Sequence, residues 1–179
     1  QWIRTMTTGE KLREVKLDLL VGPTEAVRSR LHGDERRVRP KGKRVGIHAH
    51  PTEEAIGIED DPIPVTIVGR KSDGSKYSGT VLTPRAFPFL MMKLHAFDDR
   101  KAGSAKELGR HHALDVYTIV GMMTEREYED AIRLGKLHAN KASVKRARKI
   151  VSESFSASSV IGIIRLREHP LFHVKFALN

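Results

Sequence analysis

The chain of 179 residues contains no cysteine, which excludes disulfide bonds and thiolate metal sites. Aromatic residues make up only 6%, and none is interleaved with the basic runs to stack on nucleic-acid bases. No apolar run is long enough to span a bilayer, and no charged-then-apolar signal peptide begins the sequence. We therefore expect a cytoplasmic protein without a membrane partner.

Several catalytic motifs are also missing from the sequence. It has no phosphate-binding P-loop, no dinucleotide fingerprint, no nucleophile elbow and no His-Glu-x-x-His zinc motif. A histidine–aspartate phosphohydrolase needs a His-Asp dipeptide, and none occurs. These absences exclude the enzyme classes that depend on those motifs.

What the sequence does contain is an uneven excess of positive charge, +10 in total. Residues 28–44 carry eight basic residues against Asp34 and Glu35, and residues 131–179 are similarly basic. Such regions suit a polyanionic partner such as tRNA, or they form a solvated surface that keeps the protein soluble. The candidate nucleic-acid contacts are Arg37, Arg39, Arg44, Lys145, Arg146, Arg148 and Lys149.

The first half of the chain has the pattern of strands and loops. Apolar or alternating segments predict strands at Val15–Val21, Val45–Ala49, Ala55–Ile58, Ile63–Gly69 and Gly79–Leu82. A turn signal at residues 72–75 separates the last two strands, and Thr24 can cap a short helix. We expect a small mixed sheet of about four or five strands, a typical number. A truncated sheet with an open edge would allow a homodimer.

The second half has helical periodicity. Thr83-Pro84 predicts a helix start, with Phe87, Leu90, Met91, Leu94 and Phe97 on its buried face. Ser104 is expected to cap a second helix through Gly121, and the capping box at Thr124 predicts a third. A basic helix follows from Ala142 to Phe155. The buried stripe expected for the second helix is Leu108, His112, Val116, Ile119, Val120 and Met123.

These patterns together predict an α+β fold, with a small mixed β-sheet followed by a C-terminal helical bundle. We place a sheet region in residues 1–83 and a helical region in residues 84–179. Within the helical region, residues 84–121 form one pair of helices, and residues 124–165 form the basic C-terminal helices.

Two charged residues, Asp18 and Lys93, interrupt apolar segments of the sequence. Asp18 lies in a strand-like run, where an unpaired charge is costly, so it lies at an exposed edge, is paired, or binds metal. Lys93 and Arg100 lie two helical turns apart on one face, where they could grip different oxygens of a triphosphate. Spacing alone favours a different interpretation of Lys93, in which its aliphatic stem covers the core and its ammonium reaches water.

Asp115 lies on the second helix beside two histidines. His111 and Asp115 are one turn apart, but adjacent histidines point about 100° apart, so at most one can join a metal site. The apolar stripe assigns His112 to the core instead. Asp98 and Asp99 could cap the turn or pair with Arg100 and Lys101, but the preferred interpretation is a solvated charged turn.

Four segments occur in the order found in one known family: KLDLLVG, VTIVGR, KLHAFDDR and RHHALDVY. From Val15 to Met123 the chain thus resembles an AbiEii-like nucleotidyltransferase, of the polymerase-β-type superfamily. The resemblance implies Mg²⁺-dependent transfer of a nucleoside monophosphate from NTP to an acceptor such as tRNA or another RNA. It also implies a toxin-type component with a cognate antitoxin.

The resemblance also implies roles for individual residues. Asp18 corresponds to the third acid of the metal site, and Lys93 to the lysine that binds nucleotide phosphates. Asp115 corresponds to the aspartate that steadies this lysine through an ion pair between neighbouring helices, which keeps the lysine charged. Arg100 is the second nucleotide-binding candidate.

The first acid-x-acid pair of such a site is missing before Asp18, where only Glu10 and Glu14 occur. Two-metal phosphoryl transfer needs several carboxylates that converge on the ions. The pair lies N-terminal to Gln1, comes from another subunit, or is absent from an inactive relative. In the last case the chain is a non-catalytic nucleic-acid-binding or regulatory module on a transferase scaffold.

Overall fold

The computed structural model describes residues 2–8, 11–17, 20–21 and 50–175 of the chain. Asp18, Arg37, Arg39 and Arg44 lie outside the described residues, as do the helix predicted after Thr24 and the strand predicted at Val45–Ala49. The described residues form a mixed α+β structure, as predicted. They divide into two compact units, residues 1–56 and 57–179.

The first unit contains two separate strand pairs. Strands β1 (Trp2–Thr8) and β2 (Lys11–Leu17) form an antiparallel hairpin. Strands β3 (Leu20–Val21) and β4 (His50–Pro51) form a short parallel pair. Every sheet formed by the described residues has two strands. The described residues therefore do not form the predicted mixed sheet of four or five strands.

The strand predicted at Ala55–Ile58 is wrong. A 3₁₀ turn, η1, covers Glu53–Ala55, and Gly57 follows with φ of 79°. A positive φ reverses the direction of the chain, which an extended strand cannot accommodate. The apolar character of this segment reflects burial of Ala55 and Ile56 rather than strand pairing.

The second unit begins with a long β-hairpin. Strands β5 (Ile63–Arg70) and β6 (Lys76–Thr83) pair antiparallel over their full lengths, which confirms both predicted strands and the turn between them. In the turn, Gly74 has φ of 83° and its N–H donates to the carbonyl of Lys71 at 2.9 Å. Such a conformation favours glycine.

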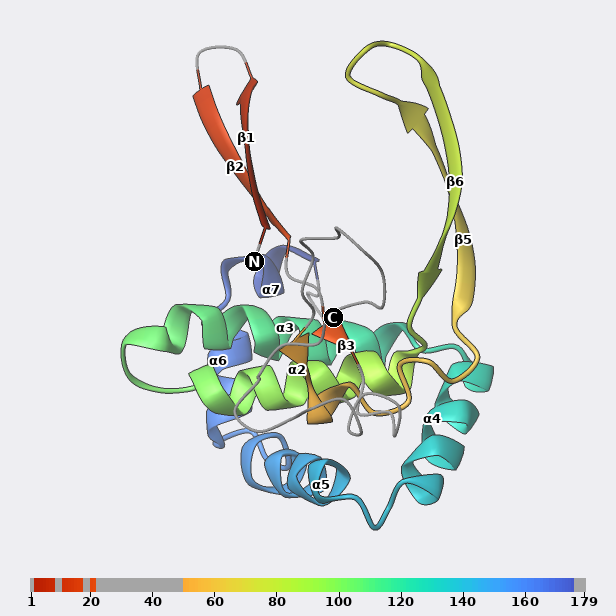
Figure 1. The fold of residues 1–179 in the computed structure, drawn as a ribbon. Coiled ribbons are helices and arrows are strands. Elements are labelled where there is room, and N and C mark those ends of the chain that lie inside the picture. Colours follow the sequence, from red (N-terminus) through yellow and green to blue (C-terminus); the bar gives the residue numbers. More distant parts are fainter. Residues whose placement is uncertain (1, 9–10, 18–19, 22–49, 176–179) are drawn as a thin grey trace, which may run out of the picture. The chain divides into compact units, whose positions relative to one another are not determined.

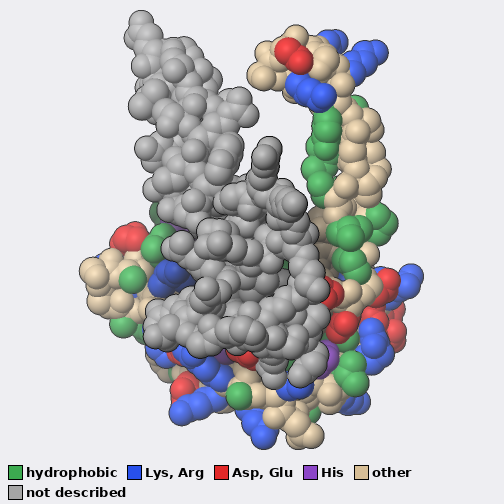
Figure 2. All heavy atoms as spheres, viewed as in Figure 1, with side chains coloured by type: hydrophobic (Ala, Val, Ile, Leu, Met, Phe, Trp, Pro, Cys, Tyr) green, Lys and Arg blue, Asp and Glu red, His purple; other side chains and the backbone are tan. Residues whose placement is uncertain are grey.

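The two faces of this hairpin differ in polarity. The register pairs Val65 with Val81 and Ile67 with Gly79, so that directly paired residues share one apolar face. Tyr77 lies over Gly79, with its hydroxyl where a Cβ would otherwise stand, and thus replaces the missing side chain. Figure 2 shows the hydrophobic side chains along the hairpin and the charged side chains at its tip.

Helices make up the rest of the second unit (Figure 1). α2 and α3 pack along each other, α4 and α5 pack on α2, and α6 packs on α3. None of the described helices is long and apolar enough to cross a membrane. The helices and the short 3₁₀ segment are α2 (Ala86–Arg100), η2 (Gly103–Ala105), α3 (Lys106–Met122), α4 (Glu125–Leu137), α5 (Ala142–Ser154), α6 (Ile161–Arg167) and α7 (Pro170–Lys175).

The start of α2 differs from its prediction. Thr83 ends β6, where its hydroxyl donates to the carbonyl of Ile63 at 3.1 Å, and it does not cap the helix. The N-cap is Arg85, whose guanidinium instead binds the carboxylate and the backbone carbonyl of Asp61. Arg85 also lies 3.5 Å from Asp130 of α4. These bonds anchor the hairpin to the helices, and β5 and β6 lie in the same compact unit as the helices.

Three of the predicted helical features are confirmed. Phe87, Met91, Leu94 and Phe97 form the buried face of α2. Thr124 and Glu127 form the reciprocal capping box that begins α4, and the basic helix α5 lies where the sequence predicts it. The irregular segment at residues 156–159 separates α5 from two C-terminal helices that the sequence pattern did not reveal.

The buried face of α3 was predicted only in part. Val116 is buried as expected, whereas Leu108 and Val120 are exposed, and the other buried residues of the helix are Gly109 and Ala113. Gly109 lies against the last turn of α2, and a Cβ there would stand 2.5 Å from the carbonyl oxygen of Arg100. Because only a residue without a side chain fits this crossing, the buried stripe follows Gly109 rather than the large apolar Leu108 beside it.

We expect Gly109→Ala to lower the free energy of unfolding by about 1–3 kcal/mol, because the added methyl overlaps the backbone of α2. Gly121→Ala, in the same helix, is the matched control, since nothing lies within 4 Å of its Cβ position. Alanine there stabilises the helix by up to about 1 kcal/mol. Urea denaturation followed by circular dichroism measures both, and equal effects would contradict close packing at Gly109.

Candidate phosphate-binding site

The central feature of the site is an ion pair between two helices. Lys93 of α2 donates from Nζ to Oδ2 of Asp115 of α3 at 2.7 Å. The two side chains are 25% and 40% exposed, so the pair lies at the edge of the core with one side open to solvent. The structure thus brings together the lysine and the aspartate that the sequence singles out.

Lys93 is held from a second direction by an aromatic ring. Its Nζ lies 5.3 Å from the centroid of Phe89, one turn earlier on α2. A cation over a ring face is attracted by the electrons of the ring. The Lys93 ammonium therefore has two fixed neighbours, unlike a lysine whose head group simply extends into water.

His112 lies near this pair. Nδ1 of His112 is 3.8 Å from Oδ2 of Asp115 and has no hydrogen-bond partner among the described residues. Burial lowers the pKa of His112 below 6.5, and the positive charges of Lys93 and Arg100 lower it further, against the opposing effect of Asp115.

His111 does not join Asp115. Its Nδ1 lies 2.8 Å from Nε2 of His169, while Nδ1 of His169 accepts the backbone N–H of Leu171 at 3.1 Å. This pattern makes Nε2 of His169 the donor to His111. Burial lowers the pKa of His169, and the neighbouring His111 and Arg110 lower it further against the opposing effect of Asp115, which favours the neutral ring. The pair joins α3 to the turn before α7, a structural role that no local sequence pattern indicated.

The described residues do not supply a metal site. No three His, Asp or Glu side chains among them are grouped so that they could hold a metal ion. Asp18, the expected metal-binding acid, lies outside the described residues. The part of the chain that the structure describes therefore does not by itself fit the Mg²⁺ that the resemblance implies.

The acids after Lys93 have a different role from the expected solvated turn. Asp98 and Asp99 belong to the last turn of α2, and Arg146 of α5 binds them at 2.9 and 3.0 Å. Burial alone would raise the pKa of Asp98, but hydrogen bonds from Lys101 and Arg146 lower it. Arg146, a candidate nucleic-acid contact, thus joins α5 to α2.

The other candidate contacts on α5 have exposed side chains. Arg148 donates to the carbonyl of Gly135 at 3.1 Å, and Lys149 lies 3.6 Å from Glu153. Lys145 is exposed one turn before Lys149. These three residues leave positive charge on the outer side of α5.

No family model, curated protein or solved structure matches the chain. The functional argument therefore rests on the residues and their geometry.

We expect Lys93→Met to raise the pKa of His112, because it removes a positive charge and leaves Asp115 unpaired. Asp115→Asn should lower the pKa of His112 below its value in the unmutated protein, because it removes a negative charge near the ring. NMR titration of the histidine Cε1 protons measures both, with His112→Gln to assign the signal. Because the pKa in the folded state is below that in the unfolded state, the stability linked to His112 is complete above about pH 6.5 and is lost as the pH falls. An unchanged pKa in both variants would contradict the geometry.

Proposed function

We propose that α2 and α3 form the phosphate-binding half of a nucleotidyltransferase site, which holds the triphosphate of an NTP. The observation that carries this proposal is the ion pair between Lys93 and Asp115, at the edge of the core with one side open to solvent. The resemblance of residues 15–123 to AbiEii-like nucleotidyltransferases supplies the reaction, the transfer of a nucleoside monophosphate to an RNA acceptor such as tRNA. A toxin-type role in the cytoplasm, with an antitoxin partner, belongs to the same proposal.

The charges of the site suit a polyanion. An ammonium has three donors, and Asp115 accepts one of them, so Lys93 retains donors for phosphate oxygens. Arg100 lies two turns further along α2, about 10 Å along the axis, and would contact a different phosphate. Burial is the main cause of the lowered pKa of His112, and the positive charges of Lys93 and Arg100 that add to it favour the same ligand.

Asp115 has a positioning role in this proposal. Its carboxylate fixes the direction of the Lys93 side chain, which otherwise has four rotatable bonds and loses their freedom on binding a ligand. An ordered lysine binds phosphate at a lower entropic cost. The Phe89 ring restricts the position of the Lys93 ammonium from a second direction.

Mg²⁺ is the cofactor that the resemblance implies, and when bound it would neutralise phosphate charge and activate the attacking oxygen. Asp18 is the residue we propose to hold it. Since the described residues contain no group of ligands for the ion, no step of the transfer is derived through it.

Calorimetric titration of each Mg²⁺–NTP into the protein tests the proposal. We expect binding to the unmutated chain, and a decrease of at least about tenfold in affinity for Lys93→Ala and Asp115→Ala, which corresponds to about 1.4 kcal/mol. Lys76→Ala is the matched control, because it removes an exposed lysine at the far end of β6. Equal affinities of Lys93→Ala and the unmutated protein would refute the proposed role of Lys93. Absence of binding by the unmutated chain would refute the proposal for this chain.

A second function is favoured by the exposed positive side of α5: a non-catalytic nucleic-acid-binding module on a transferase scaffold. Fluorescence anisotropy with labelled tRNA tests it. Replacing Lys145 and Lys149 together by alanine should weaken binding and reduce the slope of log K against log salt by about 2, because each lysine neutralises about one phosphate. An unchanged slope would place the RNA-binding residues elsewhere.

A further inference from the structure

An apolar groove of about 430 Å³ lies in the second unit. It lies between α4 and α5, over α2 and beside the end of α3. α2, α4 and α5 each contribute lining residues at spacings of three and four, the pattern of one continuous helix face. The lining includes Phe87, Leu90, Met91 and Leu94 of α2, Tyr128, Ala131, Ile132 and Gly135 of α4, and Val144, Ala147, Arg148 and Val151 of α5.

Large apolar side chains remain exposed along this groove. Tyr128 is 59% exposed, Ile132 41% and Val151 44%, and Val120 at the end of α3 is 55% exposed. These residues come from three helices and line the same hollow, so they form one contiguous apolar surface rather than scattered single residues. Such a surface marks a site of interaction with another molecule.

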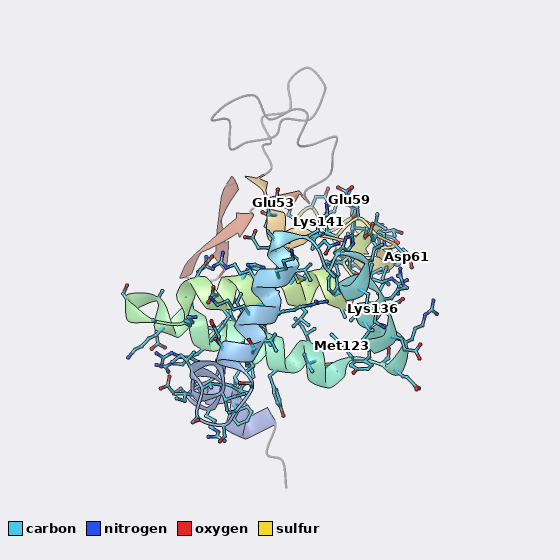
Figure 3. All side chains as sticks on the ribbon, turned by 90° about the horizontal axis from the view of Figure 1, so that it is seen from below. Glu53, Glu59, Asp61, Met123, Lys136 and Lys141 are labelled. Carbon is cyan, nitrogen blue, oxygen red and sulfur yellow. The ribbon has the colours of Figure 1, made fainter. Side chains whose placement is uncertain are left out.

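The rim of the groove along α5 is basic. Four exposed basic residues stand on α5 or directly before it, and one of them, Arg148, also lines the groove: Lys141, Lys145, Arg148 and Lys149. The exposed Glu153 lies 3.6 Å from Lys149 and offsets part of this charge. The outer side of α4 is balanced, with Glu125 and Glu129 against Arg133 and Lys136. Figure 3 shows Lys136 on the last turn of α4, Lys141 directly before α5, and Met123 directly after α3. The rim therefore has a net positive charge concentrated on one wall.

We propose that this groove binds an amphipathic helix of a partner protein, with acidic residues along the side that faces α5. The apolar stripe of such a helix, at positions i, i+3, i+4 and i+7, would fill the groove between α4 and α5. The lining residues of α5 extend over about 12 Å, or between two and three helical turns. This inference goes beyond the proposed nucleotide site, which lies where α2 faces α3.

The apolar floor and the basic rim together argue against three other occupants of the groove: a nucleic acid, residues 28–44 of this chain, and a second copy of the chain. A nucleic acid would neutralise the rim but would leave the apolar floor without a partner. The segment of this chain at residues 28–44 has eight basic residues and two acids, so it matches neither the rim nor the floor. A second copy of the chain would bring an identical basic rim against the first.

A pair of labelled peptides tests the proposal by fluorescence anisotropy. Both are 16-residue helices with leucines at i, i+3, i+4 and i+7, and they differ only in carrying glutamates or lysines along one side of the stripe. We expect the glutamate peptide to bind the full chain at least about tenfold more tightly than the lysine peptide. Replacing Lys145 and Lys149 by glutamate should reverse this preference.

Substitutions in the floor test the apolar part of the proposal. Ile132→Glu and Val151→Glu should each lower the affinity for the glutamate peptide by at least about tenfold. Both side chains are partly exposed, so the fold should tolerate the change, which circular dichroism verifies. Val68→Glu, at an exposed position of β5 away from the groove, is the matched control and should leave binding unchanged.

Three results would overturn the proposal. Equal binding of the two peptides would remove the charge argument, and full binding by both Ile132→Glu and Val151→Glu would place the peptide elsewhere. A sedimentation experiment in which Ile132→Glu converts a dimer into a monomer would assign the groove to a second copy of the chain. Nucleotide titration into Ile132→Glu separates this test from the proposed function, since Lys93 and Asp115 are unchanged in it.

Discussion

The close crossing of α2 and α3 determines the geometry on which the candidate site depends. Gly109 allows the backbone of α3 to touch the last turn of α2, and a larger residue would hold the helices apart. At that separation Lys93 reaches Asp115 with a direct hydrogen bond of 2.7 Å. An ion pair over a wider gap would include water and would orient the lysine less strictly. A backbone contact thus controls the position of a charge two turns away.

Charges on the two sides of α2 have different uses. On one side, Asp98 and Asp99 neutralise Arg146 and so fix α5 to the helix. On the other side, Lys93 pairs with Asp115 while its side chain stays partly exposed, and the nearby His112 has a pKa below its ordinary value. The first set of charges holds two helices together, and the second leaves an ordered ammonium open to solvent. An ordered, accessible ammonium is what a phosphate ligand requires.

Local patterns predicted the parts of this structure that local forces determine. The capping box at Thr124, the turn at Gly74 and the buried face of α2 each depend on residues within a few positions of one another. The partners Arg146 and His169 lie 48 and 58 residues from the side chains that they bind, and spacing carries no information about such pairs. The stripe of α3 was predicted from hydrophobicity, but a glycine at the crossing determined it. Lys93 was identified as a charge within a mainly apolar helix that matches the resembled family, and Asp115 was identified by its match to that family.

The attachment of the hairpin gives α4 an influence beyond its own position. Arg85 binds Asp61 at the root of β5 and lies close to Asp130 of α4, so the root and this helix share one side chain. A strand of eight residues is about 27 Å long. A rotation of about 10° at the root of a hairpin of this length corresponds to a displacement of about 5 Å at its tip. The bonds of Arg85 therefore decide the direction in which Arg70 and Lys76 are presented.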